Sequence, residues 1–262
     1  MKFKKSLGQH FLRDKRFVYK IVNCLSVTDK IVIEIGAGSG GVTHYIINRR
    51  PKELYCLEKD PSLIPLLKKR FTSDFVKIIN EDILDFDISS LGNKVIVFGN
   101  IPFNISNRLI RYLIKNRSFI EKAYFTFQRE FAHKLCASFN TKEYRYLSCL
   151  IQYYAKVKVI FDIPKEAFYP IPKVAASFVD IEFFEKSPFY VENESFLFEL
   201  IRKVFSSRRK KIINALSGIK GKHRRIVSKA LKEINLNENL RAENLSLEDY
   251  RRLYYKILNI KH

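Results

Sequence analysis

The segment "KIVIEIGAGSGG", residues 30–41, decides the fold predicted for this chain. A run of apolar, β-branched residues ends at a loop in which Gly36, Gly38 and Gly41 fit G-x-G-x-x-G, and a helical pattern follows. Glycines at such a strand-to-helix turn let the backbone approach a ligand closely. Glu58 lies 22 residues after Gly36, at the end of the next apolar run, where a carboxylate can accept both hydroxyls of a ribose. The segment therefore predicts a nucleotide-like cofactor, and it does not separate NAD from S-adenosylmethionine.

The first two-thirds of the chain alternates short apolar runs with longer periodic segments, which is typical of βα units and a mainly parallel sheet. Seven strands are predicted, at 30–36, 53–59, 75–81, 94–100, 122–128, 156–163 and 176–184. Helices are predicted between them at 13–26, 41–49, 61–72, 106–116 and 129–137. The last two strands leave no room for a crossover helix, so we expect an antiparallel pair joined by the proline-rich loop 164–174. The predicted fold class is therefore α/β, with a doubly wound, mainly parallel, Rossmann-like sheet of seven strands.

The pattern changes at residues 185–193. Beyond it only helical periods remain, predicted at 194–205, 207–217, 222–235 and 246–259. Ser246 and Asp249 have the spacing of a capping box at the start of the last helix. We therefore predict two domains: residues 1–184, which carry the cofactor site, and residues 185–262, a small, basic, all-helical domain.

The formal net charge of +21 is unevenly distributed. Residues 1–20 and 206–232 carry +16 of it in 47 residues, and such patches suit the neutralisation of phosphates. A solvated helix face is the plainer alternative, and the segment lacks the broad apolar face that membrane-surface binding needs. The basic residues predicted to contact a nucleic acid are Arg208, Arg209, Lys210, Lys211, Lys222, Arg224 and Arg225.

The rest of the composition argues against secretion, membrane insertion and metal binding. The N-terminus lacks a secretory signal pattern, and no run of about 18 apolar residues is present. The four cysteines, Cys24, Cys56, Cys136 and Cys149, are scattered without metal-ligand spacing. They are typical of reduced thiols, so we expect a cytoplasmic protein without a bound metal.

Two further segments place polar residues at predicted strand ends. In "NEDILDF", residues 80–86, Asp82 can accept a hydrogen bond from an adenine amine, and Ile83 can cover the ring. In "VFGNIPFNIS", residues 97–106, an apolar run ends in Asn100, Ile101, Pro102 and Phe103. A dehydrogenase would need an acid or base at its site, and these four residues offer none.

The four residues instead offer two acceptors and a ring face. The Asn100 side-chain oxygen and the Ile101 carbonyl, held by Pro102, can accept hydrogen bonds from an exocyclic amine. They favour the pyramidal geometry in which an adenine amine attacks a sulfonium methyl, while Phe103 stacks on the unstacked base. Positioning would then supply most of the catalysis.

Five segments resemble one family, the ribosomal RNA adenine dimethyltransferases, in its KsgA branch. "NIPF" (100–103) resembles the family's Asn-(Leu/Ile)-Pro-(Tyr/Phe) motif. The other four are "KKSLGQHFL" (4–12), "EIGAGSG" (34–40), "AFYPIPKV" (167–174) and "FSSRRKKIINAL" (205–216) with "RAENLS" (241–246). The chain departs from the family at His10, often Asn, at Phe103, often Tyr, and at Ala175-Ala176, commonly Asp-Ser.

The resemblance implies a methyltransferase sheet and N6,N6-dimethylation of two adjacent adenosines near the 3′ end of small-subunit (16S) rRNA. It also implies S-adenosylmethionine as cofactor, S-adenosylhomocysteine as product, and a monomer acting on a pre-30S particle. The implied cofactor-binding residues are Gln9, His10, Leu12, Gly36, Gly38, Glu58, Asp82, Ile83 and Asn100. Phe103 and Phe168 would stack on the target base, and core packing is the alternative role of Phe168.

Three rivals remain open at this point. The erythromycin-resistance methyltransferases share the first domain but act on large-subunit rRNA, and "SSRRKK" with "RAENLS" favours the small-subunit branch. A ribosome-assembly factor could bind rRNA without the chemistry. An NAD-dependent oxidoreductase would bind NADH rather than S-adenosylmethionine.

Overall fold

The structure is a computed structural model that describes residues 10–217, 219 and 224–259. The strands are β1 (Phe11–Leu12), β2 (Ile31–Ile35), β3 (Glu53–Leu57), β4 (Val76–Ile79), β5 (Val95–Asn100), β6 (Ile120–Gln128), β7 (Ala155–Ile163), β8 (Phe168–Tyr169) and β9 (Ala176–Phe183). The helices are α1 (Lys15–Cys24), α2 (Thr43–Ile47), α3 (Ile64–Arg70), α4 (Ser106–Lys115), α5 (Arg129–Cys136), α6 (Tyr146–Tyr154), α7 (Glu194–Ser206), α8 (Ile212–Leu216), α9 (Arg224–Glu233) and α10 (Leu247–Asn259). The 3-10 turns are η2 (Pro61–Leu63), η3 (Ile88–Leu91), η4 (Phe103–Ile105), η5 (Arg117–Phe119), η6 (Lys165–Ala167) and η8 (Ala242–Asn244).

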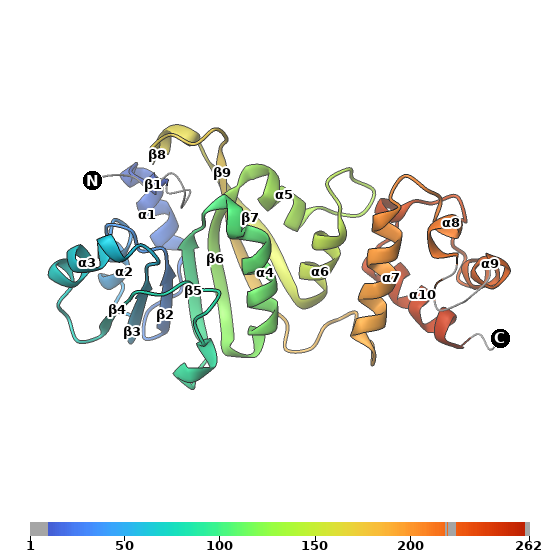
Figure 1. The fold of residues 1–262 in the computed structure, drawn as a ribbon, viewed down its shortest axis with the longest axis horizontal. Helices are drawn as coiled ribbons and strands as arrows, with labels where there is room; N and C mark the ends of the chain where they lie inside the picture. The colour runs from blue at the N-terminus through green and yellow to red at the C-terminus, as the bar shows by residue number, and fades with distance from the viewer. Residues whose placement is uncertain (1–9, 218, 220–223, 260–262) are drawn as a thin grey trace. The chain divides into compact units, whose positions relative to one another are not determined.

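Seven strands form one sheet in the order β4-β3-β2-β5-β6-β9-β7 (Figure 1). The pairs among β4, β3, β2, β5 and β6 are parallel, and β9 is antiparallel to β6. The chain runs outward from β2 to β4 and then returns to place β5 on the other side of β2. The switch point of this doubly wound sheet therefore lies between β2 and β5, where ligands bind at the carboxyl ends of strands. The predicted α/β class and the seven-stranded, mainly parallel sheet are confirmed.

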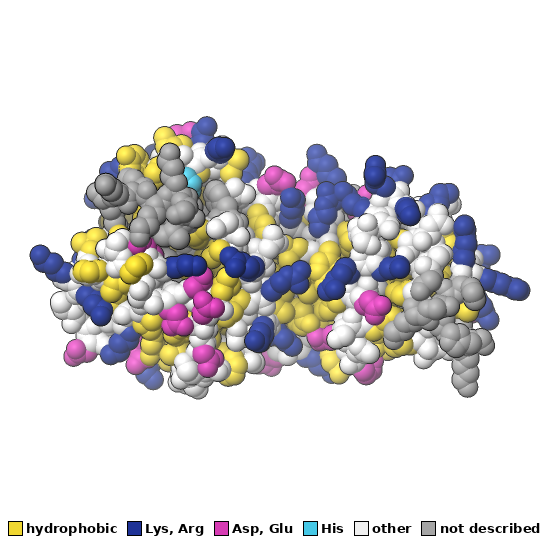
Figure 2. Space-filling model, in the orientation of Figure 1, with side chains coloured by type: hydrophobic (Ala, Val, Ile, Leu, Met, Phe, Trp, Pro, Cys, Tyr) yellow, Lys and Arg dark blue, Asp and Glu magenta, His cyan; other side chains and the backbone are white. Residues whose placement is uncertain are grey.

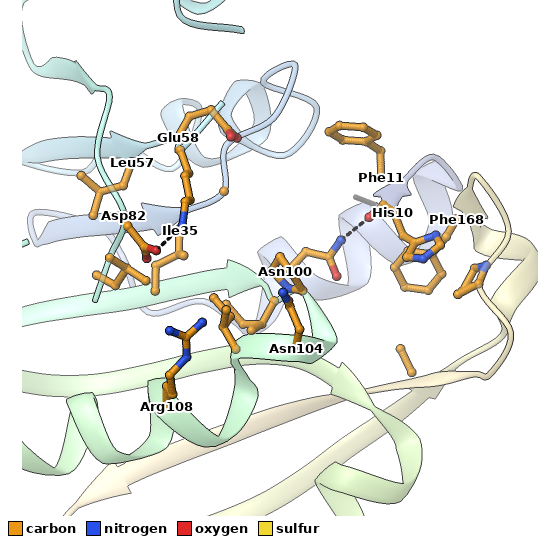
Figure 3. Close-up of a pocket in the computed structure, with 18 of the residues that line it drawn as sticks. His10, Phe11, Ile35, Leu57, Glu58, Asp82, Asn100, Asn104, Arg108 and Phe168 are labelled. Atoms are coloured by element: carbon orange, nitrogen blue, oxygen red, sulfur yellow. Dashed lines mark hydrogen bonds and ion pairs between the residues drawn. The ribbon is translucent and has the colours of Figure 1, made fainter. Parts of the chain in front are cut away.

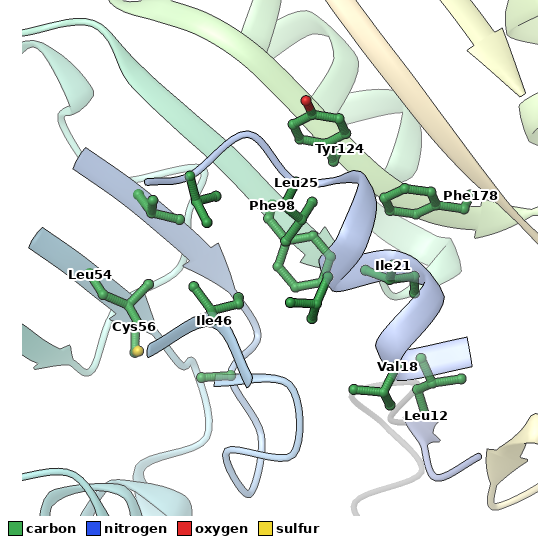
Figure 4. Packing of buried hydrophobic residues seen from close by; sticks show 14 of the residues in the cluster. Leu12, Val18, Ile21, Leu25, Ile46, Leu54, Cys56, Phe98, Tyr124 and Phe178 are labelled. Carbon is green, nitrogen blue, oxygen red and sulfur yellow. The ribbon is translucent and has the colours of Figure 1, made fainter. Parts of the chain in front are cut away.

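One face of the sheet is covered by α1, and the core between them is mainly aliphatic with several aromatic rings (Figure 4). Asp14 caps α1 by accepting a hydrogen bond from the Arg16 amide at 2.9 Å. The helix buries Val18 and Ile21 against the cluster that contains Phe98 of β5, Tyr124 of β6 and Phe178 of β9. The Tyr124 and Phe178 rings stack with centroids 6.1 Å apart. This packing fixes the centre of the sheet next to the switch point.

Some elements were not predicted. β1 and β8 form a separate two-stranded sheet whose partners, Leu12 and Phe168, lie far apart in the sequence. Helix α6 was also missed, because it is buried on most sides and shows no polar face. The helix expected at 207–217 is much shorter, since only Ile212–Leu216 is α-helical. The predicted capping box is confirmed: the Ser246 amide donates to Asp249 Oδ2 at 3.0 Å and the Asp249 amide donates to Ser246 Oγ at 3.1 Å.

The chain forms two compact units, the first of residues 1–132 and 156–183 and the second of residues 133–155 and 184–262. The second unit thus includes residues 133–155, which the sequence division at 184/185 placed with the sheet. The reason is local packing, because the Tyr153 and Tyr154 hydroxyls of α6 donate to the Glu194 carboxylate of α7 at 3.2 and 2.5 Å. Their rings also lie 5.2 and 5.7 Å from that of Phe198.

Candidate functional site

A cavity of about 220 Å³ opens at the carboxyl ends of β2, β3, β4 and β5, all in the first unit (Figure 3). Nine of the residues predicted for the site line this one cavity. They are His10, Gly36, Glu58, Asp82, Ile83, Asn100, Ile101, Pro102 and Phe168. The residues at the ends of β2, β3, β4 and β5 share one space, as expected for strand ends that meet at a switch point. His10 and Phe168 reach the same cavity by another route, the pairing of β1 with β8.

The G-x-G-x-x-G motif identifies only some of the positions at which the loop requires glycine. Gly38 has φ +61°, and a Cβ there would lie 2.5 Å from the Phe11 ring. Gly40 has φ +79°, and a Cβ there would lie 2.3 Å from the Phe71 ring. Gly41, the third glycine of the motif, has no neighbouring atom within 4 Å of a Cβ. The third constrained position is therefore Gly40, because the loop packs on Phe71.

Glu58 follows β3 and connects the glycine loop to the sheet. Its Oε2 accepts the Gly38 amide and its Oε1 accepts the Asp60 amide, both at 2.8 Å. Burial raises the pKa of Glu58, although these backbone hydrogen bonds oppose that shift. Each carboxylate oxygen retains a second lone pair, so the group can still accept the hydroxyls of a ribose.

Asp82 follows β4 and holds two partners. Its Oδ1 accepts the Leu84 amide at 3.1 Å, and its Oδ2 forms an ion pair with Lys59 Nζ at 2.8 Å (Figure 3). Burial alone would raise the pKa of this carboxyl, but Lys59 and the Leu84 amide lower it below its ordinary value. Ile83, which is buried, adds an apolar wall beside it.

Asn100 ends β5, and its amide has a fixed orientation. Its Nδ2 donates to the His10 carbonyl at 2.6 Å (Figure 3). His10 Nδ1 in turn lies 2.7 Å from the Pro170 carbonyl, so Nδ1 carries the proton. The amide nitrogen of Ile101 donates to the Thr126 carbonyl at 3.1 Å, which fixes the turn that follows. The Asn100 side-chain oxygen is consequently the part of this amide that can accept a hydrogen bond from a ligand.

The remaining predicted residues lie elsewhere or outside the described residues. Phe168 is only 4% exposed and belongs both to the cavity wall and to the hydrophobic core, so the two roles weighed for it are compatible. Leu12 packs in the core and is not among the described residues that line the cavity. Gln9, Lys222 and the side chain of Phe103 lie outside the described part of the chain.

A family model described as ribosomal RNA adenine dimethylase matches residues 1–259. The chain belongs to this family. The predicted family and its reaction class, adenine dimethylation of ribosomal RNA, are thereby confirmed.

Alignments with individual members of the family span nearly the whole chain. Ribosomal RNA small subunit methyltransferase A of Desulforapulum autotrophicum is 38% identical over 259 residues, which cover 95% of this chain and 90% of the relative. The protein of the same name from Pelagibacter ubique is 36% identical over 258 residues, with coverage of 97% and 96%.

Solved structures support the fold of this dimethylase family member. A dimethyladenosine transferase from Plasmodium falciparum has a TM-score of 0.81 at 22% identity, covering 93% of this chain and 95% of that one. The 23S rRNA methyltransferase ErmE has a TM-score of 0.76 at 20% identity, with coverage of 95% and 100%. At these identities the two structures establish the fold alone.

Several residues that line the cavity were not predicted from the sequence. Lys59 and Arg108 are the cations among them, and Arg108 contributes to the lowered pKa of Asp82. Lys59 directly follows the predicted Glu58, and Arg108 lies in the first turn of the helix after "NIPF", so proximity to a motif was the available signal. The others are Phe11, Ile35, Leu57, Glu81, Asn104, Ile105, Pro172 and Ala176.

The basic run of the second unit contains residues of two kinds. Arg208 is engaged within the unit, because its Nε lies 3.1 Å from Glu243 Oε2 and its Nη2 donates to the Lys142 carbonyl at 2.9 Å. Arg209, Lys210 and Lys211 are exposed just before α8, and Arg224 and Arg225 are exposed at the start of α9. Figure 2 shows that Lys and Arg side chains predominate over Asp and Glu on the face drawn.

Two absences concern other kinds of site. Among residues 10–217, 219 and 224–259, no group of three or more His, Cys, Asp or Glu could hold a metal ion. Within the same part of the chain, no helix is both long and apolar enough to cross a membrane.

Glu34 is a buried carboxyl on β2, just before the glycine loop. Its Oε2 accepts hydrogen bonds from Thr43 Oγ1 at 2.6 Å and from Cys56 Sγ at 3.7 Å. Burial raises the pKa of Glu34 to about 7, more than these hydrogen bonds lower it.

We expect this carboxyl to make the free energy of unfolding fall as the pH rises from 4.5, its ordinary pKa, to about 7. In that window the folded protein keeps a proton that the unfolded chain releases. At pH values above about 7 the free energy of unfolding is lower by about 3 kcal/mol than it is below pH 4.5. Glu34→Gln retains an acceptor for Thr43, so it should stabilise the protein at pH values above about 7 and change it little near 4.5. Thermal unfolding of both proteins across this range checks the expectation. Parallel pH profiles would contradict it.

Proposed function

We propose that this protein transfers methyl groups from S-adenosylmethionine to the N6 amines of two adjacent adenosines in a hairpin near the 3′ end of small-subunit (16S) rRNA. Its family supplies the reaction class, and the names of the small-subunit methyltransferases that match nearly the whole chain support the choice of subunit. The observation that carries the mechanism is the anchored Asn100 amide, whose nitrogen is held by the His10 carbonyl and whose oxygen remains to accept an N–H.

The cavity suits the proposed cofactor. Glu58 would accept the ribose hydroxyls, and Asp82 would accept the adenine amine with Lys59 as its existing partner. Ile35, Leu57 and Ile83 supply apolar walls for the flat purine. Bound S-adenosylmethionine supplies a methyl group on a positively charged sulfur, the electrophile that the reaction needs.

The target adenine would be held by the residues that follow β5. The Asn100 side-chain oxygen and the Ile101 carbonyl accept its two N–H bonds, which concentrates the nitrogen lone pair for attack. Methyl transfer would break the bond between sulfur and the methyl carbon and leave N6 with a positive charge, which makes its remaining N–H strongly acidic. Neither Asn100 nor the Ile101 carbonyl is a base, so this proton would leave to water. Phe168 in the cavity wall, with Phe103, is proposed to support the base by stacking.

The basic helical domain, residues 185–262, is proposed to dock the enzyme, as a monomer, on rRNA within a pre-30S particle. The exposed Arg209, Lys210 and Lys211 precede α8, and Arg224 and Arg225 begin α9. A nucleic-acid partner suits this arrangement because cations without acidic neighbours in sequence attract phosphates.

Mass spectrometry tests the proposed function directly. Small-subunit particles lacking the modification are incubated with the protein and methyl-labelled S-adenosylmethionine, and the rRNA is digested to nucleosides. Labelled dimethyladenosine at two adjacent positions near the 3′ end is expected. Label in large-subunit rRNA alone would instead favour an erythromycin-resistance-type activity, and no label with intact RNA binding would favour an assembly factor.

We expect Glu58→Ala to weaken cofactor binding by about 10- to 150-fold, because hydrogen bonds to a charged group contribute about 1.5–3 kcal/mol. The same change removes the acceptor of the Gly38 and Asp60 amides, so the loop also loses its attachment to β3. Isothermal titration with S-adenosylmethionine measures the affinity. Glu53→Ala is the matched control, because Glu53 lies at the opposite end of the same strand, away from the cavity, and accepts a hydrogen bond from the Tyr55 hydroxyl. Equal losses in both variants would contradict a specific role for Glu58.

A further inference from the structure

The loop that follows β8 exposes large apolar side chains beside the cavity. Tyr169, Ile171 and Val174 are 46%, 59% and 44% exposed. A soluble protein gains nothing in stability from displaying three such groups within six residues, so a closely spaced cluster of this kind marks a contact surface.

This loop is held in place at several points. β8 pairs with β1, His10 Nδ1 donates to the Pro170 carbonyl at 2.7 Å, and the Ala175 carbonyl accepts the Arg129 amide at 3.0 Å. Pro170 and Pro172 restrict the backbone further, and Pro172 lines the cavity. The exposed side chains are therefore presented in a fixed arrangement at the edge of the proposed base-binding site.

The surroundings of the loop are basic. The Arg13 guanidinium lies 4.9 Å from the centre of the Tyr169 ring, and Lys173 and Lys165 are exposed. Residues 167–176 contain no Asp or Glu, the exposed Glu166 directly precedes them beside Lys165, and the nearby Asp14 is paired with Arg16 at 2.7 Å. At the top of Figure 2, where Figure 1 places β8 and its loop, hydrophobic and basic side chains lie next to one another, with an acidic side chain among them.

We propose that Tyr169, Ile171 and Arg13 bind the unpaired nucleotides that flank the target adenosine in rRNA. An aromatic ring and an aliphatic side chain next to cations fit the flat base and the charged phosphate of unpaired RNA. A protein partner would match the apolar groups but not the positive charge of Arg13 and Lys173. This inference rests on the proposed function and adds a second contact region to it, on residues outside the cofactor and target-base pocket.

The double variant Tyr169→Ala/Ile171→Ser tests the surface in the full-length protein. The variant should bind the small-subunit particle about 5- to 150-fold more weakly, because it removes stacking and apolar contacts. Its affinity for S-adenosylmethionine should be unchanged. The matched control is Tyr19→Ala/Ile160→Ser, which removes side chains of the same types that are 51% and 42% exposed on α1 and β7. Unchanged particle affinity in the loop variant, or an equal loss in the control, would overturn the proposal.

Photocrosslinking identifies what touches the loop. Benzoylphenylalanine in place of Ile171 should crosslink to rRNA nucleotides adjacent to the methylated adenosines, and the same substitution at Ile160 should not. Crosslinks to a ribosomal protein alone, or to distant rRNA, would overturn the proposal while leaving dimethylation intact. If the unmodified protein neither binds nor methylates the particle, the proposed function fails as well, so the two failures are distinguishable.

Discussion

Asn100→Ala is expected to lower the rate of methyl transfer by about 10²- to 10³-fold, the typical cost of removing one preorganised hydrogen-bonding group at the reacting atoms. The amide is preorganised here because its nitrogen donates to the His10 carbonyl at 2.6 Å, which leaves its oxygen for the target amine. The change should affect kcat more than cofactor affinity, since Glu58 and Asp82 lie at other strand ends. Radiolabelled methyl transfer at saturating cofactor and particle measures kcat.

Two further variants separate catalysis from packing. Asn104→Ala removes an exposed amide that lines the same cavity, so it should retain most of the activity. His10→Ala removes the contact with Pro170 but keeps the backbone carbonyl that anchors Asn100, so it should lower kcat far less than Asn100→Ala does. Dimethylation that survives Asn100→Ala at the unmodified rate would show that the catalytic assignment is wrong.

The centre of the cavity was predictable from sequence, because four of its residues lie at the ends of apolar runs. In a parallel sheet the carboxyl ends of strands share one edge, so locating Gly36, Glu58, Asp82 and Asn100 at strand ends also places them near one another. The prediction needed no knowledge of side-chain contacts. It required only that each strand be found and that the sheet be parallel.

Features that depend on distant partners could not be predicted in this way. The pairing of Leu12 with Phe168 joins two-residue strands that have no local signal, yet it brings His10 beside Asn100. The ion pair of Lys59 with Asp82 likewise depends on the register of β3 and β4. Local spacing also chose Gly41 as the third constrained glycine, whereas contact with Phe71 selects Gly40.

The partners of the basic residues at 208–211 could not be predicted from the sequence either. The sequence treats Arg208 and its neighbours alike, because composition does not reveal intramolecular partners. In the folded unit Arg208 contacts Glu243 and the Lys142 carbonyl, whereas Arg209, Lys210 and Lys211 are exposed. Replacing Arg208 would therefore both break contacts within the unit and remove a predicted RNA contact. A test of RNA binding should replace the other three residues instead.

The triple variant Arg209→Ala/Lys210→Ala/Lys211→Ala is expected to weaken rRNA binding by about 10²- to 10³-fold near 50 mM salt and by about 3- to 30-fold near 200 mM. Each cation that neutralises a phosphate contributes about 0.7–0.9 to the slope of log affinity against log salt, so the slope should become shallower by about 2 to 3. Binding to small-subunit particles at several salt concentrations measures both quantities. Because these side chains are exposed, the melting temperature should stay close to that of the unmodified protein.

A control with the same change in net charge decides whether these positions matter. Lys68→Ala/Lys69→Ala/Lys77→Ala also removes three exposed cations, but from α3 and β4 of the first unit. Its slope should remain near the original value, since a phosphate contact is local whereas general attraction depends on total charge. Equal changes of slope in both variants would mean that the positive charge acts only as a whole, and an unchanged slope in the first would remove this segment from the RNA-docking surface. A separate Arg208→Ala variant should instead lower stability, by about 1 kcal/mol, because it breaks contacts inside the helical unit.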